Sequence, residues 1–308
     1  MKRLSLNLLS PLFLLFLLVF FPWAAQAQEE ELLKHPREMD FPPLSFFPPK
    51  ATRTVLSNGM ILYLLEDPEL PLVNISALIR TGSIYNPPDK IGLAQLTATL
   101  LRTGGTVERT AQAINEELEF MAAQIEFYMN RESGGASLSV RKQDFPRALA
   151  ILAGLLMKPA FDPAQLDLAK KKGVEAIRRS NENPEEIAYR EFRKVLYEGN
   201  PRGQVPSIES IENIRREDLI GFHKRFFQSN NMMLGVSGDF KREEMISALE
   251  EAFRDWERSL VELPFIPIPS PRDKKLIYHA PKNLPQSTIL LGHLSLPLGH
   301  PDHIPLKV

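Results

Sequence analysis

Short apolar segments of strand length alternate with longer amphipathic segments of helix length between residues 52 and 256, and this alternation limits the fold most strongly. We expect strands at Thr52–Leu56, Met60–Leu65, Leu72–Arg80, Ile125–Met129, Ala136–Val140 and Met232–Val236. Helices are expected at Gly92–Arg102, Thr110–Ala122, Phe145–Met157, Pro163–Asn181, Glu185–Tyr197, Arg216–Phe227 and Arg242–Trp256. Asn58-Gly59 predicts a hairpin turn between the first two strands. The pattern therefore predicts an α+β fold, a mostly antiparallel sheet with helices packed on one face.

The N-terminal 27 residues have the features of a signal peptide. Lys2 and Arg3 precede an apolar run from Leu4 to Trp23, and Ala25-Gln26-Ala27 supplies small residues where a signal peptidase cuts. Cleavage near Ala27 would leave no stable membrane anchor, and it predicts a periplasmic or secreted protein. A retained anchor is the alternative, because an apolar run of this length could span a bilayer.

The remaining chain divides by composition. Residues 28–50 are rich in Glu and Pro and predict an extended lead-in, followed by the α+β domain at residues 51–257. Residues 258–274 are proline-rich and predict a linker. Lys275–His279 and Ser287–Leu296 resemble the opening strands of a second, similar domain. The sequence stops at Val308 before such a sheet is complete, so we expect this domain (residues 275–308) to be truncated.

Charge and cysteine usage exclude several classes of function. The chain has 37 Lys and Arg against 38 Asp and Glu, which gives a net charge of -1 and predicts no nucleic-acid partner. It contains no cysteine, which excludes disulfides, thiolate catalysis and cysteine-ligated zinc. A metal site would have to use His, Asp or Glu.

Residues 82–94 resemble the stretch that leads into the active-site helix of the pitrilysin/insulinase family of zinc peptidases, which includes the mitochondrial processing peptidase. Further similar segments follow in the family's order: Leu56–Met60, Pro159–Phe161, Ile177–Arg179, Asn183-Pro184 and Asn231–Phe240. The resemblance covers residues 51–256. It implies a domain like those of LuxS and the processing peptidases.

The residues that would carry the family's chemistry differ in this chain. In the family that this chain resembles, active members carry an inverted zinc motif, His-x-x-Glu-His. Its two His bind the metal, and its Glu activates water. The matching positions here are Gln95-Leu96-Thr97-Ala98-Thr99, and the third ligand, a Glu in the family, matches Ala176. Amide and hydroxyl groups replace imidazole poorly on Zn²⁺, and alanine accepts no proton. We therefore expect no catalytic residue, no bound metal and no cofactor.

Other residues offer only weak substitutes for the missing ligands. Glu175 is next to Ala176 and would supply a carboxylate if the match were shifted by one position. No histidine lies between residues 36 and 222, however. His300 and His303 have ligand-like spacing but flank Pro301 in an expected loop.

The resemblance implies a role without catalysis. Family members often pair active with inactive chains around a chamber in which an extended peptide is added to a sheet edge. The expected peptide-binding edge here comprises Ile125, Phe127, Met129 and the flanking Asn130. We therefore expect this chain to be inactive by itself and to act as the peptide-binding partner of an active insulinase-type homologue. Two alternatives remain, an active zinc metalloendopeptidase with unconventional ligands and a purely structural subunit like the core proteins of a respiratory complex.

Overall fold

The computed structural model describes residues 45–271, 274–283 and 285–307. The chain divides into two compact units, residues 1–49 and 50–308. Residues 45–49, the described part of the first unit, form neither helix nor strand. The predicted signal peptide lies outside the described residues. None of the helices that the structure describes is long and apolar enough to cross a membrane.

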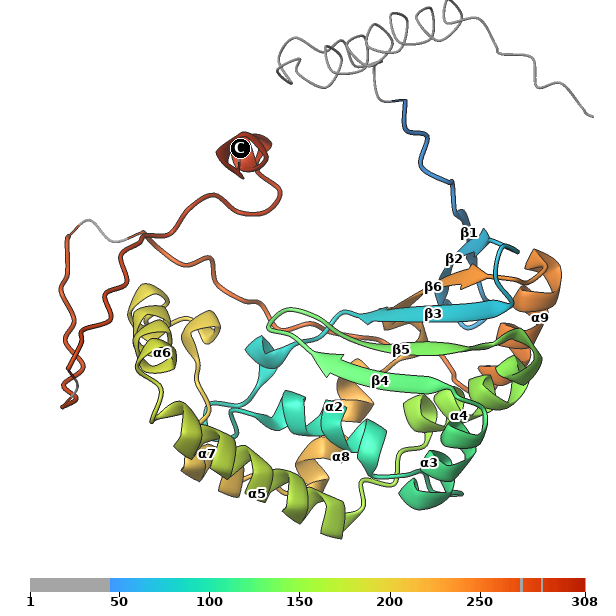
Figure 1. The fold of residues 1–308 in the computed structure, drawn as a ribbon, viewed down its shortest axis with the longest axis horizontal. Coiled ribbons are helices and arrows are strands. Elements are labelled where there is room, and N and C mark those ends of the chain that lie inside the picture. Colours follow the sequence, from blue (N-terminus) through green and yellow to red (C-terminus); the bar gives the residue numbers. More distant parts are fainter. Residues whose placement is uncertain (1–44, 272–273, 284, 308) are drawn as a thin grey trace, which may run out of the picture. The chain divides into compact units, whose positions relative to one another are not determined.

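The second unit contains a sheet, a set of helices and several short 3-10 turns (Figure 1). The strands are β1 (Thr52–Val55), β2 (Ile61–Glu66), β3 (Leu72–Ile79), β4 (Gln124–Met129), β5 (Gly134–Arg141) and β6 (Met232–Gly238). The helices are α2 (Leu93–Thr103), α3 (Ala111–Phe120), α4 (Phe145–Met157), α5 (Pro163–Ser180), α6 (Pro184–Leu196), α7 (Ile208–Glu212), α8 (Arg216–Phe226) and α9 (Arg242–Ala252). The predicted α+β class is confirmed.

The six strands form one sheet in the order β1-β2-β6-β3-β5-β4. Most neighbours are antiparallel, as expected, but β2 and β6 run parallel, with Ile61 opposite Met233. The hairpin at Asn58-Gly59 forms as predicted: Gly59 has a φ of 85°, which favours glycine, and the Leu56 amide donates to the Met60 carbonyl at 2.9 Å. The arrangement leaves β1 and β4 as the two edges of the sheet.

The two faces of the sheet differ in character because side chains alternate along each strand. In β3, Val73, Ile75, Ala77 and Ile79 are buried, whereas the residues between them are exposed. The buried side chains pack with helices such as α2 and α4 into one hydrophobic core, on one side of the sheet. The opposite face carries polar residues such as Asn74, Ser76, Ser137 and Ser139 beside larger ones such as Tyr63, and Figure 1 shows no helix of the described chain across it.

Several predictions about the chain's elements were wrong. Lys275–His279 and Ser287–Leu296 are described, and neither forms a strand. A strand needs a hydrogen-bonded neighbour and a core to cover, and two short apolar segments supply neither by themselves. The helix α7 was not predicted, although Ser207 and Ser210 form a capping box at its start. The domain boundary at residue 257 and the linker remain predictions.

His223 on α8 is buried, with 8% of its surface exposed. Its Nε2 lies 2.8 Å from the Leu156 carbonyl, and its ring stacks on Phe227 at 5.0 Å and meets the edge of Phe161 at 5.7 Å. Burial lowers the pKa of His223 to about 4 because the charged ring would lose its hydration, and the Leu156 carbonyl opposes this only in part. The ring is a neutral part of the core.

This burial predicts an acid-dependent loss of stability. Below pH 6.5 the unfolded chain binds a proton at His223 that the folded chain does not, so the free energy of unfolding falls as the pH drops toward 4. Each pH unit in the middle of this window changes it by at most about 1.4 kcal/mol, which gives roughly 1.5 kcal/mol between pH 6.5 and 5. Urea denaturation should show this extra loss relative to His223→Gln, which shares every other titrating group. Equal losses in the two proteins would contradict the assignment.

Candidate functional site

The start of α2 is held by two residues of the segment that leads into it. Gly92 has a φ of 113°, which favours glycine, and a Cβ there would lie 2.4 Å from Cδ1 of Ile211, so that side chain would have to shift to admit a larger residue. The Asn86 side chain, 5% exposed, accepts a hydrogen bond from the Ala94 amide at 2.9 Å. Asn86 thereby satisfies one of the free N–H groups in the first turn. The segment at residues 82–94, which resembles the lead-in to the family's active-site helix, therefore holds α2 in position.

The helix α2 carries Gln95, Ala98 and Thr99 on one side, because residues three and four apart share a helix face. Gln95 and Thr99 are exposed, and Ala98 is buried, with 5% of its surface exposed. The Thr99 hydroxyl donates to the Gln95 carbonyl at 3.0 Å. The surface therefore offers one amide and a hydroxyl already bonded to the helix.

The helix α5 packs against α2 and carries Ala176 in an exposed position. The neighbouring Glu175 is also exposed, and its Oε1 forms an ion pair with Nη1 of Arg178 at 2.6 Å. Zinc prefers imidazole, thiolate and carboxylate ligands, and Gln95, Thr99 and Ala176 supply none of these, so the residues present do not fit zinc. Within residues 45–307 as described, no group of three or more His, Asp or Glu side chains could hold a metal ion.

The strand β4 lies at the sheet edge and packs against α2 (Figure 1). Its backbone groups alternate between β5 and the free edge. The Asn130 amide donates to Ser133 at 2.8 Å on the β5 side, whereas the Ile125 carbonyl accepts from Nε of Arg102 at 2.7 Å on the other side. By this alternation, the N–H and C=O groups of Phe127 and Met129 point to the free edge.

The four predicted edge residues lie together, but they are not equivalent. Ile125 is fully buried, while Phe127 and Met129 are half-buried beneath the helix-covered face. Asn130 is exposed, and its backbone is already used: its carbonyl accepts from Ser83 at 3.0 Å and its amide is bonded to Ser133. The free hydrogen-bonding edge therefore ends at Met129.

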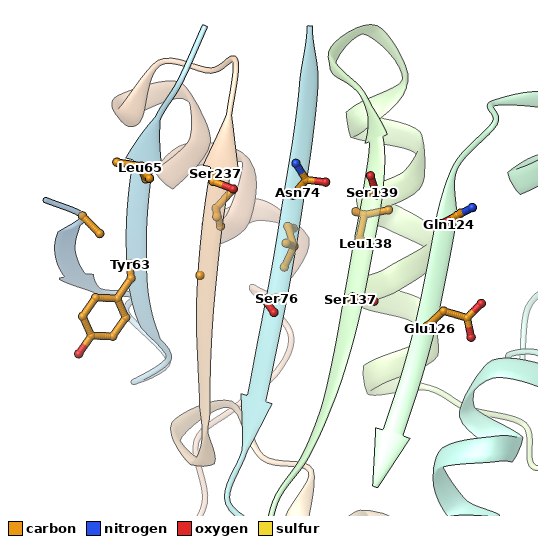
Figure 2. Close-up of a pocket in the computed structure, with 14 residues that line it drawn as sticks. Tyr63, Leu65, Asn74, Ser76, Gln124, Glu126, Ser137, Leu138, Ser139 and Ser237 are labelled. Atoms are coloured by element: carbon orange, nitrogen blue, oxygen red, sulfur yellow. The ribbon is translucent and has the colours of Figure 1, made fainter. Parts of the chain in front are cut away.

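A shallow groove of about 450 Å³ lies on the open face of the sheet and was not foreseen from the sequence. Figure 2 shows polar side chains from neighbouring strands along it. They include Tyr63, Asn74, Ser76, Gln124, Glu126, Ser137, Ser139 and Ser237. The signal was present in the alternation of serine and asparagine with apolar residues in β3 and β5, which marks the solvent side of a strand.

Comparisons with known proteins agree with this architecture. The family profile described as Insulinase (Peptidase family M16) matches residues 62–205, and that described as Peptidase M16 inactive domain matches residues 213–308. The second match begins before α8 and includes β6, a strand of the same six-stranded sheet. It therefore does not coincide with the proline-rich segment.

Related proteins and solved structures extend this result. An uncharacterized zinc protease of Rickettsia bellii is 26% identical over 64% of this chain and 48% of its own length. A probable mitochondrial-processing peptidase subunit beta of Schizosaccharomyces pombe is 24% identical over 70% of this chain and 47% of its own. A peptidase M16 inactive domain from Pseudomonas fluorescens superposes with a TM-score of 0.68 at 22% identity, over 72% of this chain and 54% of that one. The periplasmic protease PqqL from Escherichia coli superposes with a TM-score of 0.64 at 17% identity, over 74% of this chain and 26% of that one.

The structure defines an α+β domain of the metallopeptidase type, with a helix beside an edge strand. The chain belongs to the insulinase family, peptidase family M16, and the predicted resemblance is confirmed. It spans about half the length of the two relatives described above.

The ligand chemistry of α2 and α5 predicts that the purified chain retains no stoichiometric zinc after desalting, measured by elemental analysis. A matched variant with Gln95→His, Thr99→His and Ala176→Glu supplies three zinc ligands and should gain up to one zinc per chain. About one zinc per unmodified chain would contradict this prediction.

Proposed function

We propose that this insulinase-family chain is itself non-catalytic, binds extended peptides along the free edge of β4 and acts as the partner of an active homologue. One observation carries the proposal. The free edge of β4 lies directly beside α2, whose exposed Gln95 and Thr99 do not fit zinc. Backbone pairing with a peptide needs no catalytic side chain, so binding can persist without the metal.

The open edge of β4 supports peptide addition. Nε of Arg102 donates a hydrogen bond to the Ile125 carbonyl. The backbone groups of Phe127 and Met129, in contrast, have no strand opposite them in the described structure. Natural proteins usually cover or charge such an edge, because it would otherwise pair with other chains. An edge left open beside a helix that carries the degenerate motif is consistent with a site kept for an extended ligand.

The comparisons support a partner role by analogy. The Schizosaccharomyces pombe relative is named as a subunit of a processing peptidase, and part of this chain matches a profile described as inactive. Relatives named as zinc proteases are the reason to consider an active enzyme as well. The side chains that α2 and α5 offer at the motif positions argue against an active zinc enzyme. The other alternative, a purely structural subunit, would not bind peptide, so a peptide-binding measurement distinguishes it from our proposal.

Peptide addition to β4 is tested by proline at position 127. Phe127→Pro removes a free-edge N–H while the residues that pair with β5 keep theirs, so the sheet should persist. Binding of a labelled extended peptide, measured by fluorescence anisotropy, should weaken by about ten-fold, because a backbone hydrogen bond is lost and the ring obstructs the edge.

Val55→Pro is the matched control. The Leu56 amide pairs with Met60, so the Val55 amide points away from β2 at the opposite edge of the sheet. This variant should bind peptide as the unmodified chain does. Equal affinity of Phe127→Pro, or equal losses in both variants, would remove β4 as the peptide site.

We also propose export, based on residues 1–27 and in keeping with a fold shared with a periplasmic protease. N-terminal sequencing of the chain from periplasmic extracts should begin at or near Gln28. A cytoplasmic product that begins at Met1 would exclude export with cleavage.

A further inference from the structure

Several arginines lie around the end of β4. The turn after β4 carries Arg131 and Glu132, α6 carries Arg193, and the short turn η4 (Pro201–Gly203) carries Arg202. Glu132 is already engaged, because its Oε1 accepts from Nε of Arg202 at 2.6 Å. Glu132 therefore forms its ion pair with Arg202 and not with Arg131 or Arg193.

Arg131 and Arg193 are the two members of the cluster without an acid. Both are half-buried, and in the described structure no carboxylate lies within 4.0 Å of either guanidinium. Arg193 donates from Nη2 to the Gln204 carbonyl at 3.2 Å, while its Nε is buried without a hydrogen-bond partner. An unpaired guanidinium N–H removed from water destabilises the site unless another group accepts it.

The two guanidinium groups also repel each other. Burial lowers the pKa of Arg193, and the positive charge of Arg131 lowers it further. Geometry places the two residues in the same region, because Glu132, next to Arg131, pairs with Arg202, and Arg193 donates to the carbonyl of Gln204, two residues after Arg202. A partly buried cation is usually balanced by an anion, yet no carboxylate of the described residues lies within 4.0 Å of either guanidinium. A bound carboxylate would offset the repulsion and could accept two parallel hydrogen bonds from a guanidinium fork.

The pair is placed in line with the free edge of β4. Arg131 follows Met129 by two residues, and its carbonyl accepts from the Ile84 amide at 3.0 Å, which fixes the turn. Figure 1 shows β4 pointing toward the side of the domain where α6, and so Arg193, lies. A peptide paired with Phe127 and Met129 would reach the position of Arg131 within one or two further residues, at about 3.3 Å per residue.

We propose that Arg131 and Arg193 form a subsite for a carboxylate of the peptide held on β4, so that the chain selects extended peptides with an acidic group at this end. The proposal rests on the peptide-binding function above. The carboxylate could be a Glu or Asp side chain or a free C-terminus, and both present the same planar acceptor.

Four labelled peptides test the subsite with the whole chain. All share an extended core of alternating Val and Thr. One is neutral and amidated, one has Glu near the N-terminus, one has Glu near the C-terminus, and one has a free C-terminal carboxylate. At least one acidic peptide should bind about ten-fold more tightly than the neutral one, equivalent to about 1.4 kcal/mol. The peptide that gains affinity identifies the source of the carboxylate.

Charge-removing variants assign the effect to the two arginines. The advantage of the acidic peptide should fall below about two-fold in Arg131→Gln and in Arg193→Gln, while affinity for the neutral peptide stays unchanged. It should persist in Arg53→Gln, an exposed position on β1 at the opposite edge. If a Gln variant fails to fold, Arg131→Lys or Arg193→Lys replaces it and should lose part of the advantage, because an ammonium group cannot form the planar fork.

The outcomes separate this proposal from the one on which it rests. Equal binding of acidic and neutral peptides overturns the carboxylate subsite and leaves peptide binding intact. An acidic advantage that survives in both Arg131→Gln and Arg193→Gln also overturns it. Failure of every peptide to bind overturns both the subsite and the proposed function.

Discussion

The pairing of β6 with both β2 and β3 is the constraint on which the rest of the structure depends. Met232, Leu234 and Val236 of β6 are buried in the core, and the strand is hydrogen-bonded on both sides. Because β6 occupies the middle of the sheet, β1 and β4 become its edges. The position of β4 beside α2, and with it the proposed peptide site, follows from this long-range pairing.

The residues that hold α2 in place are separate from those that would do chemistry on it. Leu93, Leu96 and Leu100 are buried and pack into the core, whereas Gln95 and Thr99 face outward. Outward positions contribute little to stability, so imidazole ligands there can be exchanged without loss of the helix. The structure thus explains how a member of this family could keep its fold while its metal site degenerates. On α2 the leucines of the core and the two exposed motif positions, Gln95 and Thr99, therefore lie on different faces of the helix.

Local signals in the sequence were sufficient for most of the helices and for the hairpin. Pro163 marks the start of α5, and Asn58-Gly59 marks the first turn, through backbone preferences that act within a few residues. The position of β6 between β2 and β3, and its parallel pairing with β2, could not be read in this way because they depend on distant parts of the chain. The placement of Arg193 near Arg131 was missed for the same reason.

The candidate site was likewise predictable only in part. The family resemblance placed the altered motif on one helix and named β4 as the peptide edge, and the structure puts the two side by side. It did not indicate that the backbone carbonyl and amide of Asn130 are already hydrogen-bonded to Ser83 and Ser133. Hydrogen bonds of this kind depend on the exact register of a turn, which composition and periodicity do not specify.

The central claim is that this chain supplies peptide contacts but no catalysis. The most direct measurement is mass spectrometry of unstructured peptides after incubation with the purified chain alone, and with an insulinase-family subunit from the same organism that has an intact His-x-x-Glu-His motif. We predict that the chain alone leaves the peptides intact with or without chelator, and that the mixture cleaves them faster than the active subunit alone. Chelator-sensitive cleavage by the purified chain alone would contradict the account.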